Sequence, residues 1–458
     1  MHLLRGQTRG LEAGAEAVDL EQTPGDIVIL SAADTEIAGL AAARRALDEP
    51  FPALRLANWM ALKHPYSVDL YGEEILAHAR LIAIRLLGGL SYWRYGVEEA
   101  QRIARASGAK LLLVSGDATW DPVLAGEGTV GEADARRFWS YLAEGGSENF
   151  ADTLRFCAHL IGEGTAPPDA RPLPRAGFYG KLRAGKGDRS VAAIVFYRAL
   201  LQAGQTEPVD ELCRAVKKRG LQPLPIYVSS LKMAEDAAFV EQAFADHDPA
   251  VVLNATAFAV SKAGAAFAGT PLDGSRRPVL QVTFAGVSRQ AWAASMRGLS
   301  PSDLTMNVVL PEVDGRIIGR AVSFKQADAL DPLTECRPVR YRPEPDRIAF
   351  VAELAAGWAR LQAKDNGEKR LAVILSNYPN RDGRLANGVG LDAPESTVRL
   401  IAALSGAGFD TGDAPDNGKS LMDQLLAGPT NALNGRKRSG SIKFLTALYN
   451  RHFSVLSP

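Results

Sequence analysis

The chain has 458 residues, of which 47% are apolar and 23% are charged. At roughly 150 residues per domain this length predicts about three domains, and the composition excludes a disordered or collagen-like chain. Lysine plus arginine and aspartate plus glutamate both number 52, so the formal net charge is zero. A chain without excess positive charge is a poor match for nucleic acid, because that binding depends on neutralising phosphates.

Neither a secretory signal nor a membrane span is predicted. The first residues carry arginines and glycines where a signal peptide needs an uninterrupted apolar stretch, and the apolar stretch 251–269 is interrupted by Asn254 and Lys262. The three cysteines lie far apart without a CxxC pair. We therefore expect no disulfide framework and no thiolate zinc site, and a reducing, cytoplasmic location fits.

Short apolar runs alternate with amphipathic stretches in the first half of the chain. The apolar runs predict strands at 26–32, 53–59 and 110–116, with a weaker strand candidate starting at Arg85. The amphipathic stretches predict helices at 38–48, 69–84 and 97–106. Because strands separated by helices are typical of parallel sheets, the first half is expected to be doubly wound.

A second and a third α/β unit are expected after a linker at 162–181, which contains four prolines. The second unit has predicted strands starting at 190, 223, 250 and 277 and helices at 211–219 and 235–245; the third has a strand from Arg370 and a helix at 395–406. We therefore predict an α/β, multidomain fold of parallel-sheet, Rossmann-like units with crossover helices. The predicted divisions are 1–165, 166–330, 331–434 (the start of a larger body domain) and a basic tail at 435–458.

Common catalytic signatures do not match. Residues 412–420 look like a phosphate-binding loop, but five residues separate the two glycines instead of four and no strong strand precedes them. No GxGxxG or GxSxG motif stands in a suitable context, and the six histidines are scattered without the i, i+4 pairing of a zinc site. This chain is therefore not expected to hydrolyse ATP by itself.

Polar and aromatic residues gather at the predicted strand ends, where open α/β sheets bind their ligands. They would suit a flat ligand rimmed by carboxylates, because aromatic faces and hydrogen-bonding groups stand together. For the first group the alternative is a packing corner capped by aromatic rings. The residues are Tyr92 and Trp93, Tyr197 and Arg198, and Asn254 and Phe258.

Two carboxylates, Glu312 and Asp314, lie between Pro311 and Gly315. In an extended segment they would point to the same side. Such a pair can act as a general base or contact a metal ion. The alternative is a solvated turn in which a carboxylate pairs with Arg316.

A long polar loop between a predicted strand and helix is more typical of function than of a plain connection. It spans residues 377–394. Its candidate residues are Asn377, Tyr378, Arg381, Asp382, Arg384 and Asn387.

Taken in order, seven segments resemble the large-subunit family of cobaltochelatase and magnesium chelatase, in its amino-terminal portion. The resemblance is greater to the aerobic cobaltochelatase branch and runs from about residue 20 to 431; from Gly435 onward the sequence does not resemble the family's continuation. The segments begin at Leu87 (LGGLSYWRYG), Val195 (VFYRALLQAG), Val228 (VSSLK), Leu253 (LNATAF), Leu310 (LPEVDGRIIGRAVSFK), Ser376 (SNYPNRDGRLANGVGLDAPEST) and Leu426 (LAGPTN).

The resemblance implies insertion of cobalt into the tetrapyrrole hydrogenobyrinic acid a,c-diamide, in cobalamin biosynthesis, with ATP hydrolysed by separate AAA+ partner subunits. This chain would be the tetrapyrrole-binding large subunit or a truncated part of it. The alternatives are a non-catalytic fragment that binds tetrapyrrole or docks partners, and a magnesium chelatase-type large subunit.

Roles for the candidate residues follow as hypotheses. Glu312 and Asp314 are assigned to proton acceptance or transient metal contact, because carboxylates accept protons and bind Co²⁺ moderately. Arg381 and Arg384 are assigned to clamping substrate carboxylates. The remaining candidates, in particular Tyr92, Trp93, Phe258 and Tyr378, are assigned to contact the ring or shape its pocket.

Overall fold

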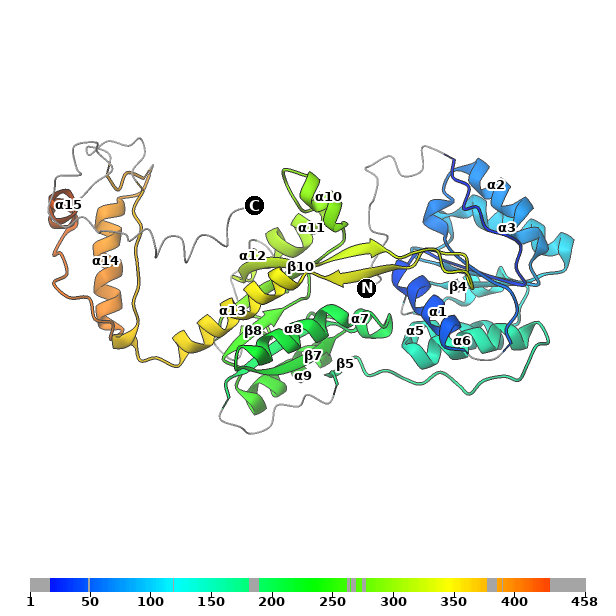
Figure 1. The fold of residues 1–458 in the computed structure, drawn as a ribbon, viewed down its shortest axis with the longest axis horizontal. Coiled ribbons are helices and arrows are strands. Elements are labelled where there is room, and N and C mark those ends of the chain that lie inside the picture. Colours follow the sequence, from blue (N-terminus) through cyan, green and yellow to red (C-terminus); the bar gives the residue numbers. More distant parts are fainter. Residues whose placement is uncertain are drawn as a thin grey trace. The chain divides into compact units, whose positions relative to one another are not determined.

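The computed structural model describes residues 17–47, 50–117, 119–180, 189–261, 264, 269–273, 277–376, 385–388 and 390–428. The chain divides into two compact units at the boundary between Ala359 and Arg360. Within the first unit we call residues 17–160 the first lobe and residues 176–359 the second lobe, since each carries its own sheet (Figure 1).

The first lobe is built on a parallel sheet with the strand order β2-β1-β3-β4 among the described residues. Its strands are β1 (Ile27–Ser31), β2 (Leu54–Asn58), β3 (Leu81–Leu86) and β4 (Lys110–Ser115). Its helices are α1 (Asp34–Ala46), α2 (Pro65–Glu74), α3 (Arg94–Ser107), α4 (Pro122–Gly126), α5 (Glu132–Glu144) and α6 (Ser147–Leu160), with short 3-10 turns at Trp59–Ala61, Leu76–His78 and Leu90–Tyr92.

Helices cover both faces of this sheet, as the alternation of buried side chains requires. Ile27 and Ile29 of β1 pack with α1, α5 and α6 on one face. Val28 and Leu30 pack with α2 and α3 on the other face. The doubly wound arrangement expected from the sequence is therefore confirmed.

The helix predicted at 69–84 is wrong in its second half. The helix α2 ends at Glu74, and residues 81–86 form the central strand β3, paired with β1 and β4. The apolar run Leu81–Leu86 is buried throughout. A strand buried on both faces cannot be distinguished from a buried helix by periodicity alone, which explains the error.

The second lobe has the strand order β11-β10-β9-β8-β6-β7-β5 among its described residues, with β6 to β10 parallel and both outer strands antiparallel to their neighbours. The strand β11 lies beyond the division expected near residue 330 and still pairs with β10. Its strands are β5 (Ala176–Phe178), β6 (Val191–Tyr197), β7 (Gln222–Val228), β8 (Val251–Asn254), β9 (Val279–Ala285), β10 (Ile317–Ala327) and β11 (Val339–Pro343).

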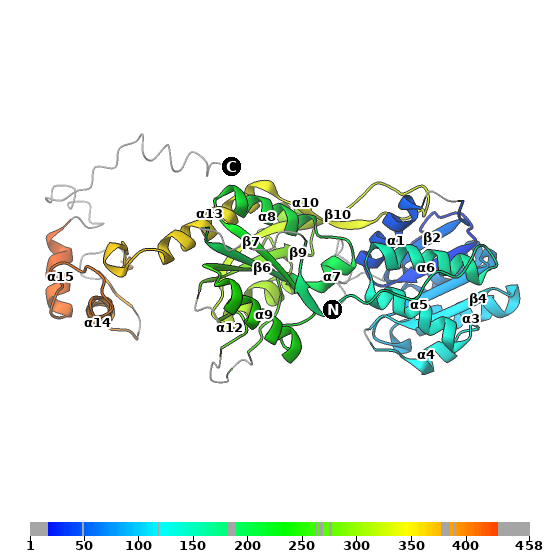
Figure 2. The same ribbon diagram turned by 90° about the horizontal axis from the view of Figure 1, so that it is seen from below.

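Helices also cover both faces of the second sheet. Figure 2 shows α8 and α13 on one side and α9 and α12 on the other. The helices are α7 (Arg198–Gln202), α8 (Glu207–Lys218), α9 (Ala234–His247), α10 (Arg289–Ala294), α11 (Pro301–Leu304), α12 (Leu310–Val313) and α13 (Pro345–Gln362), with a π-helical turn at Thr305–Val309.

The connection between β10 and β11 reaches the first lobe and covers its edge strand. The amide of Leu56 in β2 donates to the carbonyl of Thr334 at 3.1 Å, and Arg55 pairs with Glu335 at 3.1 Å. An edge strand otherwise exposes unpaired backbone groups. The two lobes are therefore joined by backbone as well as side-chain contacts.

The second unit contains α14 (Ala393–Gly406), α15 (Gly418–Ala427) and a 3-10 turn at Asn366–Glu368. The helix expected at 395–406 is confirmed. The strand expected from Arg370 is not formed: residues 371–376 have no regular structure, and Leu371, Val373 and Ile374 are exposed. Apolar content alone does not form a strand, because a strand needs a neighbour to satisfy its backbone groups.

None of the helices that the structure describes is both long and apolar enough to cross a membrane. The cysteines Cys157, Cys213 and Cys336 are all buried and free of disulfides, and burial raises the pKa of the Cys336 thiol to about 11.

Gly39 provides a test of the packing of α1 on α6. A Cβ at this position would lie 2.3 Å from the ring of Phe150, so we expect Gly39→Ala to destabilise the protein by about 1–3 kcal/mol. The matched control is Gly126→Ala, whose Cβ meets open space and should be neutral or stabilising by up to about 1 kcal/mol. Urea unfolding of both variants checks this, and equal midpoints would contradict the packing.

Candidate functional site

The second sheet has a switch point between β6 and β8. The chain passes from β6 to β7 on one side and then returns to β8 on the other side. Loops that leave neighbouring strands in opposite directions open a crevice at the carboxyl edge, where open α/β sheets bind ligands. Tyr197 at the end of β6 and Asn254 at the end of β8 stand at this edge.

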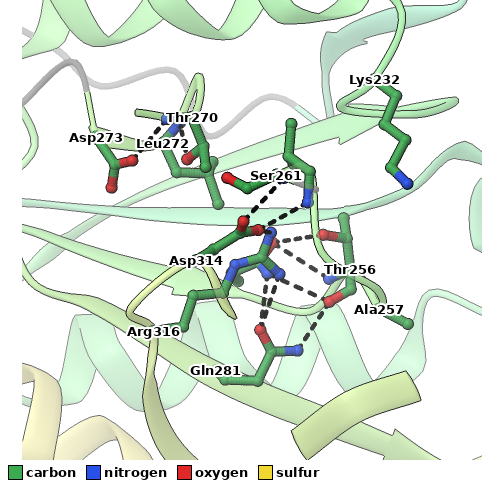
Figure 3. A network of polar contacts seen from close by, with 12 residues as sticks. Lys232, Thr256, Ala257, Ser261, Thr270, Leu272, Asp273, Gln281, Asp314 and Arg316 are labelled. Carbon is green, nitrogen blue, oxygen red and sulfur yellow. Dashed lines mark hydrogen bonds and ion pairs between the residues drawn. The ribbon is translucent and has the colours of Figure 1, made fainter. Parts of the chain in front are cut away.

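Asn254 and Gln281 belong to a buried polar network at this edge. Figure 3 shows Gln281 with Thr256, Asp314 and Arg316 in this network. The amide of Asn254 donates to the Gln281 side-chain oxygen at 2.9 Å, and the Gln281 amide donates to the Thr256 carbonyl at 2.8 Å. The Thr256 hydroxyl donates to the Asn254 oxygen at 2.8 Å. Both buried amides therefore have hydrogen-bond partners, and through Thr256 they fix the loop that follows β8.

Asp314 and Arg316 complete the network from the segment before β10. The two side chains pair at 2.9 Å and are 1% and 2% exposed, so the charges are paired where water does not reach. Arg316 also donates to Gln281 at 3.2 Å. Burial lowers the pKa of Arg316, and the Asp314 carboxylate opposes that effect.

Asp314 anchors the loop 256–261. Its carboxylate oxygens accept the backbone amides of Val260 at 2.8 Å and Ser261 at 3.0 Å. With Arg316 as a further partner, this carboxylate is fully engaged. The structure therefore places Asp314 as a support for the loop.

Phe258 and Tyr197 belong to the same loop arrangement. The Tyr197 hydroxyl donates to the Ala257 carbonyl at 2.8 Å and accepts the Ala257 amide at 3.1 Å. Phe258 has a φ of 67°, a conformation that is uncommon for a residue other than glycine. Such strain persists only where the surroundings impose it and is concentrated at functional sites.

Glu312 and Asp314 do not share one side, and the expectation from an extended segment is wrong. Residues 310–313 form the helix α12, in which residues two apart point in very different directions. Glu312 is exposed and its carboxylate has no hydrogen-bond or ion-pair partner among the described residues, whereas Asp314 is buried. The pairing of an acid with Arg316 does occur, but as a buried pair and not in a solvated turn.

The aromatic corner in the first lobe has two different roles. Trp93 is buried, stacks on Trp59 at 5.5 Å and donates from its indole to the Leu62 carbonyl. Tyr92 is 64% exposed and lies over Gly88. Trp93 therefore packs the core of the first lobe, which agrees with the alternative of a packing corner. Of these two residues, Tyr92 is the one that is exposed and could contact a ligand.

Arg198 follows Tyr197 but points away from the network. Its guanidinium pairs with Glu144 at 2.8 Å and donates to the carbonyls of Leu173 and Pro174. Burial lowers the pKa of Arg198, and Glu144 opposes that effect. Arg198 thus joins the second lobe to α5 of the first.

The polar loop of the second unit is only partly described. Asn387 is exposed, and its carbonyl accepts from the Ser376 hydroxyl at 3.2 Å. The other candidates of this loop, Asn377, Tyr378, Arg381, Asp382 and Arg384, lie outside the described residues.

A cavity between the two lobes was not expected from the sequence. It has a volume of about 540 Å³ and lies beside the carboxyl ends of β1 and β2. On its wall Lys325 of β10 pairs with Asp34 at 3.4 Å, and Asn58 donates to Asp34 at 2.8 Å. Burial lowers the pKa of Lys325. Asp34 and Asn58 at the ends of neighbouring strands were a sign of this cavity in the sequence.

No group of three or more metal-binding side chains occurs among the residues that the structure describes. Lys232, labelled in Figure 3, comes from the loop after β7 and is exposed. The sequence alone does not predict a role for Lys232.

Substitutions at Asp314 and Glu312 test the support role. Asp314→Ala leaves the Arg316 guanidinium buried without its counter-charge, so we expect a loss of about 3–5 kcal/mol in the free energy of unfolding. The exposed Glu312→Ala should change it by less than about 0.5 kcal/mol. Hydrogen exchange gives a local readout: a milder Asp314→Asn change should accelerate exchange at Val260 and Ser261, and unchanged protection there would refute the anchor.

Tyr197 should make stability fall at high pH. Burial raises its pKa to about 12 from the ordinary value of 10, so the folded protein retains a proton that the unfolded chain loses. Its contribution is complete below pH 10 and is lost as the pH rises from 10 to 12. We expect Tyr197→Phe to show a shallower decline in this window, as measured by urea unfolding at several pH values; an identical slope would contradict it.

Comparison with known proteins agrees with this architecture. The family model described as CobN/Magnesium Chelatase matches residues 139–458, which include the tail that was expected to fall outside the resemblance. The chain is 43% identical over 450 residues to the aerobic cobaltochelatase subunit CobN of Sinorhizobium sp. and 42% identical over 446 residues to that of Pseudomonas aeruginosa. In both cases the alignment covers 94% of this chain and 35% of the relative.

A solved structure supports the same relationship. The catalytic subunit of cobaltochelatase from Mycobacterium tuberculosis superimposes with a TM-score of 0.63 and 31% sequence identity, covering 89% of this chain and 33% of that one. The chain thus spans about a third of the length of the relatives that it matches. From the family match over most of its length, this chain belongs to the CobN/magnesium chelatase family.

Proposed function

We propose that this chain is the amino-terminal, tetrapyrrole-contacting part of a cobaltochelatase large subunit, which takes part in inserting cobalt into hydrogenobyrinic acid a,c-diamide. One observation carries the proposal: in a chain of this family, Tyr197, Asn254, Phe258, Asp314 and Arg316 gather at one sheet edge. That edge is the switch point where α/β sheets bind ligands.

The reaction makes three demands on the protein. Two ring N–H protons must leave the macrocycle, the Co²⁺ substrate must lose its waters, and the ring must expose its nitrogen lone pairs. A carboxylate can serve the first two, because it accepts protons and binds a divalent cation moderately. Of the two acids assigned from the sequence, Glu312 is the one whose carboxylate is open, so the role of proton acceptor falls to Glu312.

The buried network serves the third demand by holding the surface that meets the ring. Asp314 holds the backbone at residues 260 and 261, and Tyr197 holds it at residue 257. Phe258 lies between these two anchors in its strained conformation. Because this loop is already fixed, the Phe258 side chain would lose little conformational freedom when it contacts the tetrapyrrole, and this favours binding of a flat ligand.

Arg381 and Arg384, which lie outside the described residues, keep their proposed role of clamping peripheral carboxylates of the substrate, and Asn377, Tyr378 and Asp382 keep their proposed role in binding the substrate. Guanidinium groups bind carboxylates through two parallel hydrogen bonds. The family resemblance implies that AAA+ partner subunits hydrolyse the ATP, and the spacing of residues 412–420, which differs from that of a phosphate-binding loop, agrees with this assignment.

A second candidate is a fragment that binds the tetrapyrrole or docks partner subunits without catalysis. The alignment with the two CobN relatives covers 35% of their length. A visible-absorbance titration with the corrinoid precursor, with and without Co²⁺, ATP and AAA+ partners, separates the two. Insertion supports the chelatase, binding alone supports the fragment, and absence of binding refutes both. Replacing Co²⁺ with Mg²⁺ and the corrinoid with a porphyrin tests a magnesium chelatase-type subunit.

Glu312→Gln in the complete chelatase tests the proton acceptor. We expect turnover to fall by about 100-fold or more, with the tetrapyrrole affinity changed little, because general-base catalysis contributes about 10²–10⁴-fold. The matched control is Glu241→Gln, an exposed glutamate on α9 without a described partner. The assignment is lost if both variants turn over at the same rate.

A further inference from the structure

Three arginines gather around two aromatic rings at the β10 side of the second lobe. The guanidinium carbons of Arg289 and Arg347 each lie 4.6 Å from the centre of the Trp292 ring. The guanidinium of Arg320 lies 3.4 Å from the ring centre of Phe350. These side chains come from α10, β10 and α13, so the tertiary fold and not one local motif assembles them.

A small apolar cluster holds this platform in place. Trp292 packs on Phe324 with ring centres 5.5 Å apart, above the buried residues Ala285, Val287 and Ala321. Stacking on these rings orients the guanidinium groups. The Nε of Arg289 donates to Glu344 and the Nε of Arg347 donates to the Ala321 carbonyl, so the terminal N–H groups are the ones that remain for a partner. The arginines are therefore oriented before any partner arrives.

Positive charge exceeds negative charge at this surface. Arg289 pairs with Glu344 at 3.0 Å, and Asp346 is the other nearby acid. Arg320 has no hydrogen-bond or ion-pair partner among the described residues, and the exposed Arg297 lies on the loop after α10. The pKa of Arg347 is lowered mainly by burial and also by Arg320 and Arg289, while Asp346 and Glu344 oppose these effects.

We propose that Arg289, Arg320 and Arg347 form a docking surface for an acidic polypeptide segment. Charge complementarity selects the partner, since oriented guanidinium edges match carboxylates. Tryptophan and arginine are also the residue types that dominate interface energetics. Phe350, on which Arg320 stacks, is 43% exposed, which suits the apolar side chains of such a segment.

Two other anions fit this surface less well. A small anion would not span all three guanidinium groups, because Arg289 and Arg347 lie on Trp292 while Arg320 lies on a second ring, Phe350. Nucleic acid would need open ring faces for base stacking, and the arginines already occupy stacking positions on Trp292 and Phe350. The proposal does not depend on the chelatase activity.

The test measures binding of a short fluorescein-labelled poly-L-glutamate peptide to the full chain by fluorescence anisotropy. We expect the triple variant R289Q/R320Q/R347Q to raise the Kd at least about tenfold. The matched control is R94Q/R105Q/R136Q, which removes three exposed arginines of the first lobe and should leave the Kd within about twofold. Equal effects of the two triples, or no effect of the first, would overturn the proposal.

Two further arms keep the result decisive. The variant R289K/R320K/R347K retains the positive charges and controls for a loss of folding in the glutamine variant. It should bind the peptide with an affinity between those of the natural chain and the glutamine variant. Labelled oligothymidylate and a polycarboxylate porphyrin are titrated at the same salt concentration. If either binds more tightly than the peptide and loses that binding in the first triple variant, the surface serves nucleic acid or tetrapyrrole and the proposal is wrong.

Discussion

The carboxyl edge of the second sheet depends on one buried ion pair, Asp314 with Arg316. Burying two charges is unfavourable unless they are paired and bonded to further groups, and here Gln281, Val260 and Ser261 supply such bonds, while the Nε of Arg316 has no partner among the described residues. The pair therefore acts over a distance along the chain: residues just before β10 determine the path of the loop after β8. That loop carries Phe258, so the strain at Phe258 is sustained by charges fifty-six residues later in the sequence.

Most of the fold could be predicted, because its strands are short apolar runs bounded by polar or turn residues. The exceptions have physical causes. The run Leu81–Leu86 is apolar on both faces, and only its partners β1 and β4 show that it is a strand. The run at 371–375 has the same composition, yet it lacks a strand neighbour among the described residues and stays irregular. Composition predicts burial, whereas pairing decides the structure.

The candidate site was predicted in part. Tyr197, Asn254, Phe258, Asp314 and Arg316 do converge, since strand ends of a parallel sheet share an edge. The sequence could not show which polar groups are already engaged in hydrogen bonds and ion pairs within the protein. Residues close together in the sequence differ in this way. Asp314 binds backbone amides, whereas the Glu312 carboxylate is exposed. Arg198 binds groups of the loop before β5 and of the first lobe, whereas Tyr197 binds within the network. Such divisions depend on side-chain direction, which in α12 differed from the extended expectation.

The contacts between the lobes constrain how the cavity beside β1 and β2 can change its width. Separating the lobes would pull Lys325 from Asp34, break the bond from Leu56 to Thr334 and uncover an edge strand, all at once. These contacts oppose a hinge motion between the two lobes. We therefore expect the cavity to keep nearly the same width and to admit ligands that already fit it, without the lobes closing on a ligand after it binds.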